Sequence, residues 1–126
     1  MNETRIEESS IKCLIDRFYG KVNADPQLAP VFQAAIGSTD AEWQPHLRKM
    51  YAFWGAVMLN RPGYRGNPFQ KHKDLPAFDP TLFDRWLALF AETAHEVYVP
   101  EIAARYIDRS QMIAAGLKAG LYPLAG

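Results

Sequence analysis

The chain reads Trp43-Gln44-Pro45-His46-Leu47-Arg48-Lys49-Met50-Tyr51-Ala52-Phe53-Trp54 across the stretch that decides its fold. Apolar side chains recur there every three or four residues, which is the period of an α-helix. At about 100° per residue, Met50 and Phe53 fall within about 40° of His46 around the helix axis. The stretch therefore predicts a helix that turns a histidine toward the protein interior, among aromatic side chains.

The same period runs through the rest of the chain. Apolar residues recur at helical spacing from Ile11 to Val22, and a shorter segment follows over residues 26–32. Helix boundaries are expected at Ser9 or Ser10, at Thr39 or Asp40, at Asn60, at Asp79-Pro80 and at Val99-Pro100. No segment alternates with the two-residue period of a strand. The sequence therefore predicts an all-α protein with a single domain over residues 1–126.

Composition argues against several classes of protein. Fourteen Lys and Arg balance fourteen Asp and Glu, so no overall field gathers nucleic acid or anionic membrane. The first residues lack the apolar core of a signal peptide, and no apolar run reaches the length of a membrane span. Cys13 is the one cysteine, which rules out an intrachain disulfide, and we expect it to be a small buried hydrophobe. These features predict a cytoplasmic protein without a membrane or nucleic-acid partner, and we expect a monomer.

The helical period fails between residues 61 and 79. Three prolines and two glycines interrupt it before residue 77, and a loop of this length in a small domain usually has a function or is disordered. Phe69 and Leu75 lie three residues on either side of His72 and would anchor the segment against a core. The lysines that flank His72 disfavour protonation of its imidazole, which keeps the ring available as a neutral ligand.

Each histidine has an ordinary structural explanation beside a functional one. His46 can be a core histidine with one hydrogen-bond partner, and His72 can be a surface residue of a basic loop. His95 falls near the angle of Asp84 on a solvated face, and we assign it no chemistry. Zinc is disfavoured because three histidines without spaced carboxylates or thiols make a poor ligand set. A metal inside a porphyrin, in contrast, needs only one protein ligand. Two histidines from separate segments can face each other across such a flat cofactor, one binding its metal and one guarding the open side.

Fragments along nearly the whole chain together resemble a known family. They are Arg17-Phe18-Tyr19-Gly20-Lys21-Val22, Pro30-Val31-Phe32, Pro45-His46-Leu47 with Met50, Tyr51, Phe53 and Trp54, His72 with Leu75-Pro76, and Asp84-Arg85-Trp86-Leu87. In this order and spacing, from about Ile11 to Leu117, they resemble the group III truncated haemoglobins. The distal histidine with a tyrosine and a tryptophan is typical of group III, and the chain lacks the Gly-Gly pairs of groups I and II.

The resemblance implies a shortened globin fold, with helices packed two on two around haem b. Residue by residue, it implies His72 as the iron ligand, Phe32, Lys49, Phe69 and Leu75 as cofactor contacts, and Tyr19, His46, Met50 and Trp86 on the distal side where a gas binds. Lys49 matches a position that often pairs with a haem propionate. Met50 stands where the family usually has an aliphatic residue, and this departure is polarizable and oxidisable.

The distal donors suit more than one function. A tyrosine hydroxyl, an indole N–H and an imidazole N–H that could swing as a gate would all stabilise negative charge on bound oxygen. One interpretation is a protein that binds O2, CO and NO for transport, storage or sensing. A second is a redox enzyme, a nitric oxide dioxygenase or a peroxidase-like protein, which needs an external reductase because the sequence has no flavin or reductase segment. A third is a helical interaction module in which the aromatic residues are only core.

Overall fold

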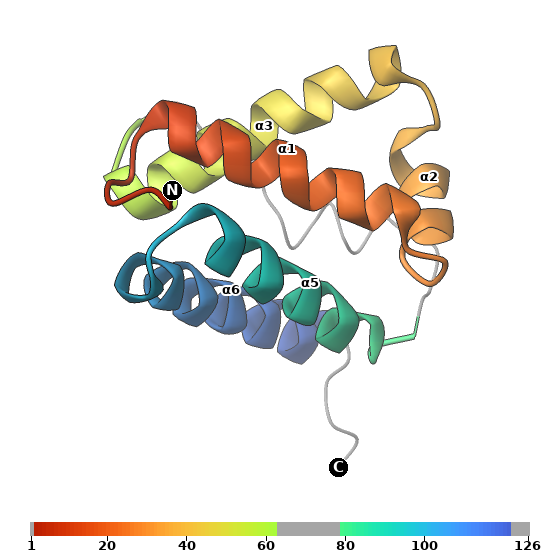
Figure 1. Cartoon of the computed structure of the whole chain (residues 1–126). Coiled ribbons are helices and arrows are strands. Elements are labelled where there is room, and N and C mark those ends of the chain that lie inside the picture. The colour runs from red at the N-terminus through yellow and green to blue at the C-terminus, as the bar shows by residue number, and fades with distance from the viewer. Residues whose placement is uncertain (1, 63–78, 122–126) are drawn as a thin grey trace.

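The computed structural model describes residues 2–62 and 79–121 (Figure 1). Five helices lie in these ranges: α1 (Glu8–Ala24), α2 (Ala29–Ile36), α3 (Asp40–Leu59), α5 (Leu82–Val97) and α6 (Pro100–Leu121). Strand pairing within the described residues is limited to an isolated bridge between Glu3 and Tyr98. The predicted all-α class is confirmed. None of the described helices is long and apolar enough to span a membrane.

The helices form two layers. Figure 1 shows α1 and α3 in one layer and α5 beside α6 in the other, with α2 joining α1 to α3 at one end. Helix α1 contacts α3 within its own layer and α5 across the two layers. This is the two-on-two arrangement that the resemblance implies, and α1 is its central helix.

Capping side chains fix where α1 and α3 begin. Thr39 caps α3, because its Oγ1 accepts a hydrogen bond from the Glu42 N–H at 3.2 Å while the Glu42 carboxylate accepts one from the Thr39 N–H at 3.2 Å. Asn60 ends α3 in the left-handed conformation, with φ 55°. Both boundaries agree with the sequence pattern. Helix α1 starts earlier than predicted, since Glu7 is its cap and Ser10 Oγ accepts a hydrogen bond from the Glu7 N–H at 2.9 Å.

Helix α2 begins later than its sequence pattern indicated. The pattern suggested a segment over residues 26–32, whereas the helix covers Ala29–Ile36. The side chain of Asp25 explains the shift, because its Oδ2 accepts hydrogen bonds from the backbone N–H groups of Gln27 at 3.1 Å and Leu28 at 2.9 Å. An aspartate whose side chain accepts hydrogen bonds from the backbone N–H groups of the residues that follow it forms a turn. The chain therefore turns before the helix starts.

Large aromatic side chains fill the space between the layers. Trp86, Phe90 and Trp54 stack in sequence, with ring centroids 5.3 Å apart in the first pair and 5.0 Å in the second. Tyr98 and Tyr106 stack at 4.7 Å and share a hydrogen bond of 2.8 Å between their hydroxyl groups. Most of these rings are completely buried. The core therefore accounts for a large part of the aromatic content.

Cys13 is exposed, so the expectation that it is a buried hydrophobe is wrong. The buried positions of α1 repeat at three- and four-residue spacing from Ile11 to Val22. Cys13 lies about 200° from Ile11 around the helix axis, on the opposite face. Its position in the helical period decides its exposure, and its apolar character does not.

Candidate functional site

Tyr19 brings together the residues that the sequence singled out on the first three helices. Its ring, from α1, lies edge-on to the imidazole of His46 in α3, with centroids 5.0 Å apart. The same ring lies edge-on to Phe32 in α2, at 5.9 Å. Tyr19 is 6% exposed, while Phe32 and His46 are half-buried. One buried hydroxyl-bearing ring therefore contacts two other candidate residues.

Trp43 is the member of this cluster that sequence reasoning left without a role. Its ring lies 5.5 Å from Tyr19 and 5.3 Å from His46, and it stacks on Phe32 at 6.4 Å. Its indole N–H donates to the carbonyl oxygen of Gly37 at 2.9 Å, which fixes the ring against the turn before α3. Helical arithmetic already contained the signal, because a residue three positions before His46 shares its helix face.

His46 lies between two aromatic rings. Its imidazole is nearly perpendicular to Tyr19, at 86°, and to Trp43, at 89°. The Nε2 atom is closed off from solvent. The structure thus agrees with the inward orientation that the helical angle predicted for this histidine.

Trp86 reaches the cluster through one intervening ring. It lies edge-on to Phe18 at 5.2 Å, and Phe18 in turn lies edge-on to Tyr19 at 4.9 Å. Trp86 is half-buried, as is Met50 one turn after His46, and both pack against the core. Tyr19 and Trp86 therefore both contact Phe18.

The two donor side chains carry no charge of their own. Burial raises the pKa of the Tyr19 hydroxyl above its ordinary value, so the group stays protonated and can donate. Among residues 2–62 and 79–121, no group accepts a hydrogen bond from the Tyr19 hydroxyl or from the Trp86 indole N–H.

An open groove of about 630 Å³ between α1 and α3 reaches Tyr19 and Trp43 from outside. The Tyr51 hydroxyl donates to Asp16 at its rim, and Lys12 pairs with the same carboxylate at 2.8 Å. Burial, together with the adjacent Asp16 carboxylate, raises the pKa of Tyr51 to about 12. The outer side of the aromatic cluster is therefore polar, whereas the side toward α5 is apolar.

Several residues chosen from the sequence cannot be placed in this cluster. Phe69, His72 and Leu75 lie outside the described residues. Lys49 is exposed on α3. His95 is also exposed, and its backbone carbonyl accepts a hydrogen bond from the Asn2 side chain at 3.0 Å. Within the described ranges, no group of three or more His, Cys, Asp or Glu side chains is arranged to hold a metal ion.

Comparisons with known proteins assign the chain to a family. The group 3 truncated haemoglobin of Campylobacter jejuni is 40% identical over 121 residues, which cover 96% of this chain and 95% of that protein. The crystal structure of the group III truncated haemoglobin from Campylobacter jejuni superposes with a TM-score of 0.96 and 40% identity, covering 100% of this chain and 99% of that one. The chain belongs to the group III truncated haemoglobins. No family model matches it.

The residues of this truncated haemoglobin fit the haem that its family implies. Half-buried apolar side chains lie along α3 and α5 and pack against the core, among them Met50, Phe53, Leu82 and Trp86. Such a surface suits a flat apolar ring.

The burial of Tyr19 predicts a specific dependence of stability on pH. An unfolded tyrosine ionises at about pH 10, whereas the folded Tyr19 has a raised pKa. The stabilisation from its neutral form is complete below about pH 10 and is lost as the pH rises further. In urea denaturation, the difference in unfolding free energy between wild type and Tyr19→Phe should stay constant from about pH 7 to 9. Above about pH 10 it should fall by about 1.4 kcal/mol per pH unit.

Phe32→Leu provides the control, because it alters a neighbouring ring that does not titrate. Its difference from wild type should not vary with pH over the same range. A Tyr19→Phe difference that is equally flat above pH 10 would show that the hydroxyl ionises normally in the folded protein.

Proposed function

We propose that this truncated haemoglobin binds haem b and, on its distal side, the diatomic gases O2, CO and NO. The contact between Tyr19 and His46 carries the proposal, because it draws a hydroxyl and an imidazole from two helices into one shielded place. Preorganised donors in a site that excludes water are suited to a ligand that gains negative charge on binding. Haem, when bound, supplies the iron to which such a gas attaches.

The distal contacts are proposed for Tyr19, His46, Met50 and Trp86. The Tyr19 hydroxyl stays protonated because it is buried, and it is the best placed donor. The Trp86 N–H and the His46 imidazole supply two further donors, and Met50 adds an apolar contact on the same face as His46. One hydrogen bond to a charged acceptor contributes about 1.5–3 kcal/mol, which slows release of the ligand by roughly ten- to a hundredfold.

The haem itself is proposed to be held by residues from both sides. His72 would bind the iron, since it precedes Leu75-Pro76, as the family resemblance implies. Phe69 and Leu75 would pack on the ring near His72, and Phe32 would pack on it from α2. Lys49 would meet a propionate, a role that its exposure on α3 supports.

Replacement of His72 tests its assignment as the iron ligand. His72→Ala removes the one proposed iron ligand, so the variant should retain little haem after purification and a buffer exchange that leaves the wild type loaded. His95→Ala serves as the control, because His95 is exposed and its side chain has no proposed role. The haem content follows from the Soret absorbance relative to protein. A His72→Ala protein with a wild-type ferrous spectrum would refute the assignment.

Replacement of the donors tests the distal assignment. Tyr19→Phe and Trp86→Phe should each change the oxygen dissociation rate by about tenfold or more, following the strength of a hydrogen bond to a charged acceptor. The two changes can differ in sign, because loss of one donor lets another reorient. Tyr51→Phe is the matched control, since it removes a tyrosine hydroxyl that binds Asp16 instead. Stopped-flow rates that match wild type in both donor variants would exclude these donors.

We further propose that His46 gates access to the site. Its Nε2 atom is closed off from solvent, so the ring must leave its contacts with Tyr19 and Trp43 for that atom to reach water. A protonated imidazole favours that outward position. His46→Leu should therefore change the association rate of carbon monoxide, which depends on access more than on hydrogen bonding. In the wild type the rate should rise as the pH falls from about 8 to 5.5. A rate that responds to neither change would leave His46 as a fixed wall of the site.

A further inference from the structure

The carboxylate of Asp25 is the point at which three segments of the site are joined. Asp25 follows the last residue of α1, and its side chain is 3% exposed. Oδ1 accepts hydrogen bonds from Arg85 Nε at 2.9 Å and Arg85 Nη2 at 2.7 Å. Oδ2 accepts hydrogen bonds from the backbone N–H groups of Gln27 and Leu28. One buried carboxylate thus ties the end of α1 to the approach to α2 and to the first turn of α5.

Each of the three joined segments carries a residue of the candidate site. Tyr19 belongs to α1. Phe32 lies in α2, one helical turn after Leu28, and Trp86 directly follows Arg85 in α5. The backbone N–H of Phe32 donates to the Leu28 carbonyl at 3.1 Å. This bond connects the residue that carries the Phe32 ring to the turn formed at Asp25. A shift at Asp25 would therefore move the candidate residues relative to one another.

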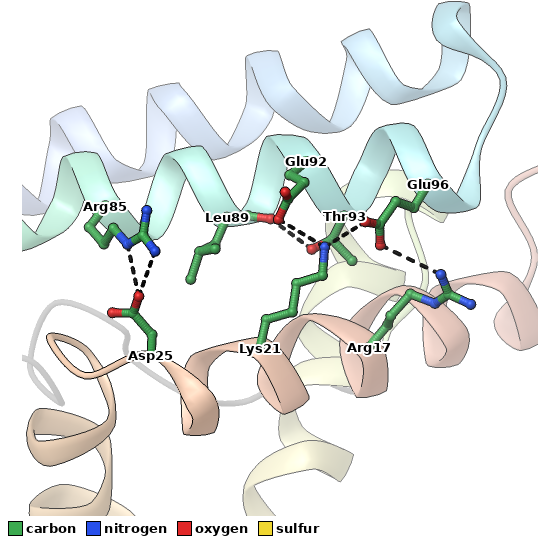
Figure 2. A network of polar contacts seen from close by, with 8 residues as sticks. All are labelled: Arg17, Lys21, Asp25, Arg85, Leu89, Glu92, Thr93 and Glu96. Carbon is green, nitrogen blue, oxygen red and sulfur yellow. Dashed lines mark hydrogen bonds and ion pairs between the residues drawn. The ribbon is translucent and has the colours of Figure 1, made fainter.

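The polar contacts between α1 and α5 fall into two groups, which Figure 2 shows side by side. At one end, Arg85 meets Asp25. Farther along, Lys21 pairs with Glu92 at 2.9 Å and Glu96 at 2.8 Å. The second group is exposed at its carboxylates, with Glu92 59% and Glu96 39% exposed, whereas Asp25 is buried. Exposed pairs contribute little to stability or position, while a buried and fully hydrogen-bonded carboxylate restricts its partners strongly.

We propose that Asp25 is a positioning residue that holds Trp86 and Phe32 in register with Tyr19 for ligand binding, an inference that rests on the proposed function. The Arg85 guanidinium beside Asp25 lowers the pKa of that carboxyl, so the group is ionised at neutral pH and accepts at both oxygens. An ionised carboxylate accepts hydrogen bonds on either oxygen and donates none. Only such a group can serve Arg85 and the two backbone N–H groups together.

The variant Asp25→Asn breaks this arrangement at nearly constant volume. An amide has one accepting oxygen and one NH2 group. Whichever way it is turned, the NH2 group faces donors, either those of Arg85 or those of Gln27 and Leu28. One of the two attachments is therefore lost. Glu96→Gln is the matched control, because it makes the same chemical change between the same two helices, at the end of α5 away from Trp86.

The experiment uses the haem-loaded ferrous protein with carbon monoxide bound, in wild type and both variants. Two readouts report position and not stability: the stretching frequency of bound carbon monoxide, which senses nearby donors, and the NMR signal of the Trp86 indole N–H. Asp25→Asn should shift both. In a separate sample with oxygen bound, it should change the oxygen dissociation rate by about three- to tenfold, as a displaced donor loses part of its hydrogen bond. Glu96→Gln should reproduce the wild-type values.

The alternative outcomes separate this inference from the proposed function. If the wild type takes up no haem, the proposed function fails and the variants are not needed. If the wild type loads normally but Asp25→Asn keeps the wild-type frequency, indole signal and off-rate, Asp25 has no positioning role. If Asp25→Asn fails to fold, Arg85→Lys tests the positioning role in its place. That variant keeps the positive charge but replaces the contact of two guanidinium nitrogens with that of a single ammonium group. It should shift the same readouts in the same direction, and wild-type values in that variant would overturn the inference.

Discussion

The packing of α1 between α3 and α5 is the constraint on which the rest of the structure depends. Consecutive residues of a helix point about 100° apart, so Phe18 and Tyr19 enter two different environments. Phe18 is fully buried against Trp86 and Phe90 in the core, whereas Tyr19 meets Phe32 and His46. Core packing and site geometry are thus set by adjacent side chains of one helix, and a change in how α1 packs alters both.

Ion-paired side chains and the aromatic cluster lie in different parts of the molecule. The ion pairs between α1 and α5 lie at the surface, apart from Asp25, which is buried and paired. The site cluster is built from aromatic rings, and the hydroxyl of Tyr19 is held in the protonated form by burial. A site of this kind offers little to a charged metabolite. It offers dipoles to a small ligand whose charge develops only on binding.

Helical periodicity was enough to predict the fold class, the boundaries of α3 and the inward face of His46. It was not enough where a side chain bonds to backbone or to a distant segment. The Asp25 turn delayed α2, and its ion pair with Arg85 joins residues far apart in sequence. The helical period puts Trp43 on the same face as His46, but it does not contain the contacts of Trp43 with Tyr19 and Phe32 on two other helices. The roles of single residues in ligand binding came only from the family resemblance, and they stay predictions.

We propose that these helices form a site for one haem with an accessible gas-binding face. Titration of haem into the haem-free protein, followed by reduction and exposure to carbon monoxide, tests it most directly. We expect a sharp Soret band that saturates at one haem per chain and that carbon monoxide shifts completely. A Soret absorbance that never saturates, or one that carbon monoxide leaves unchanged, would contradict a single haem site open to gases.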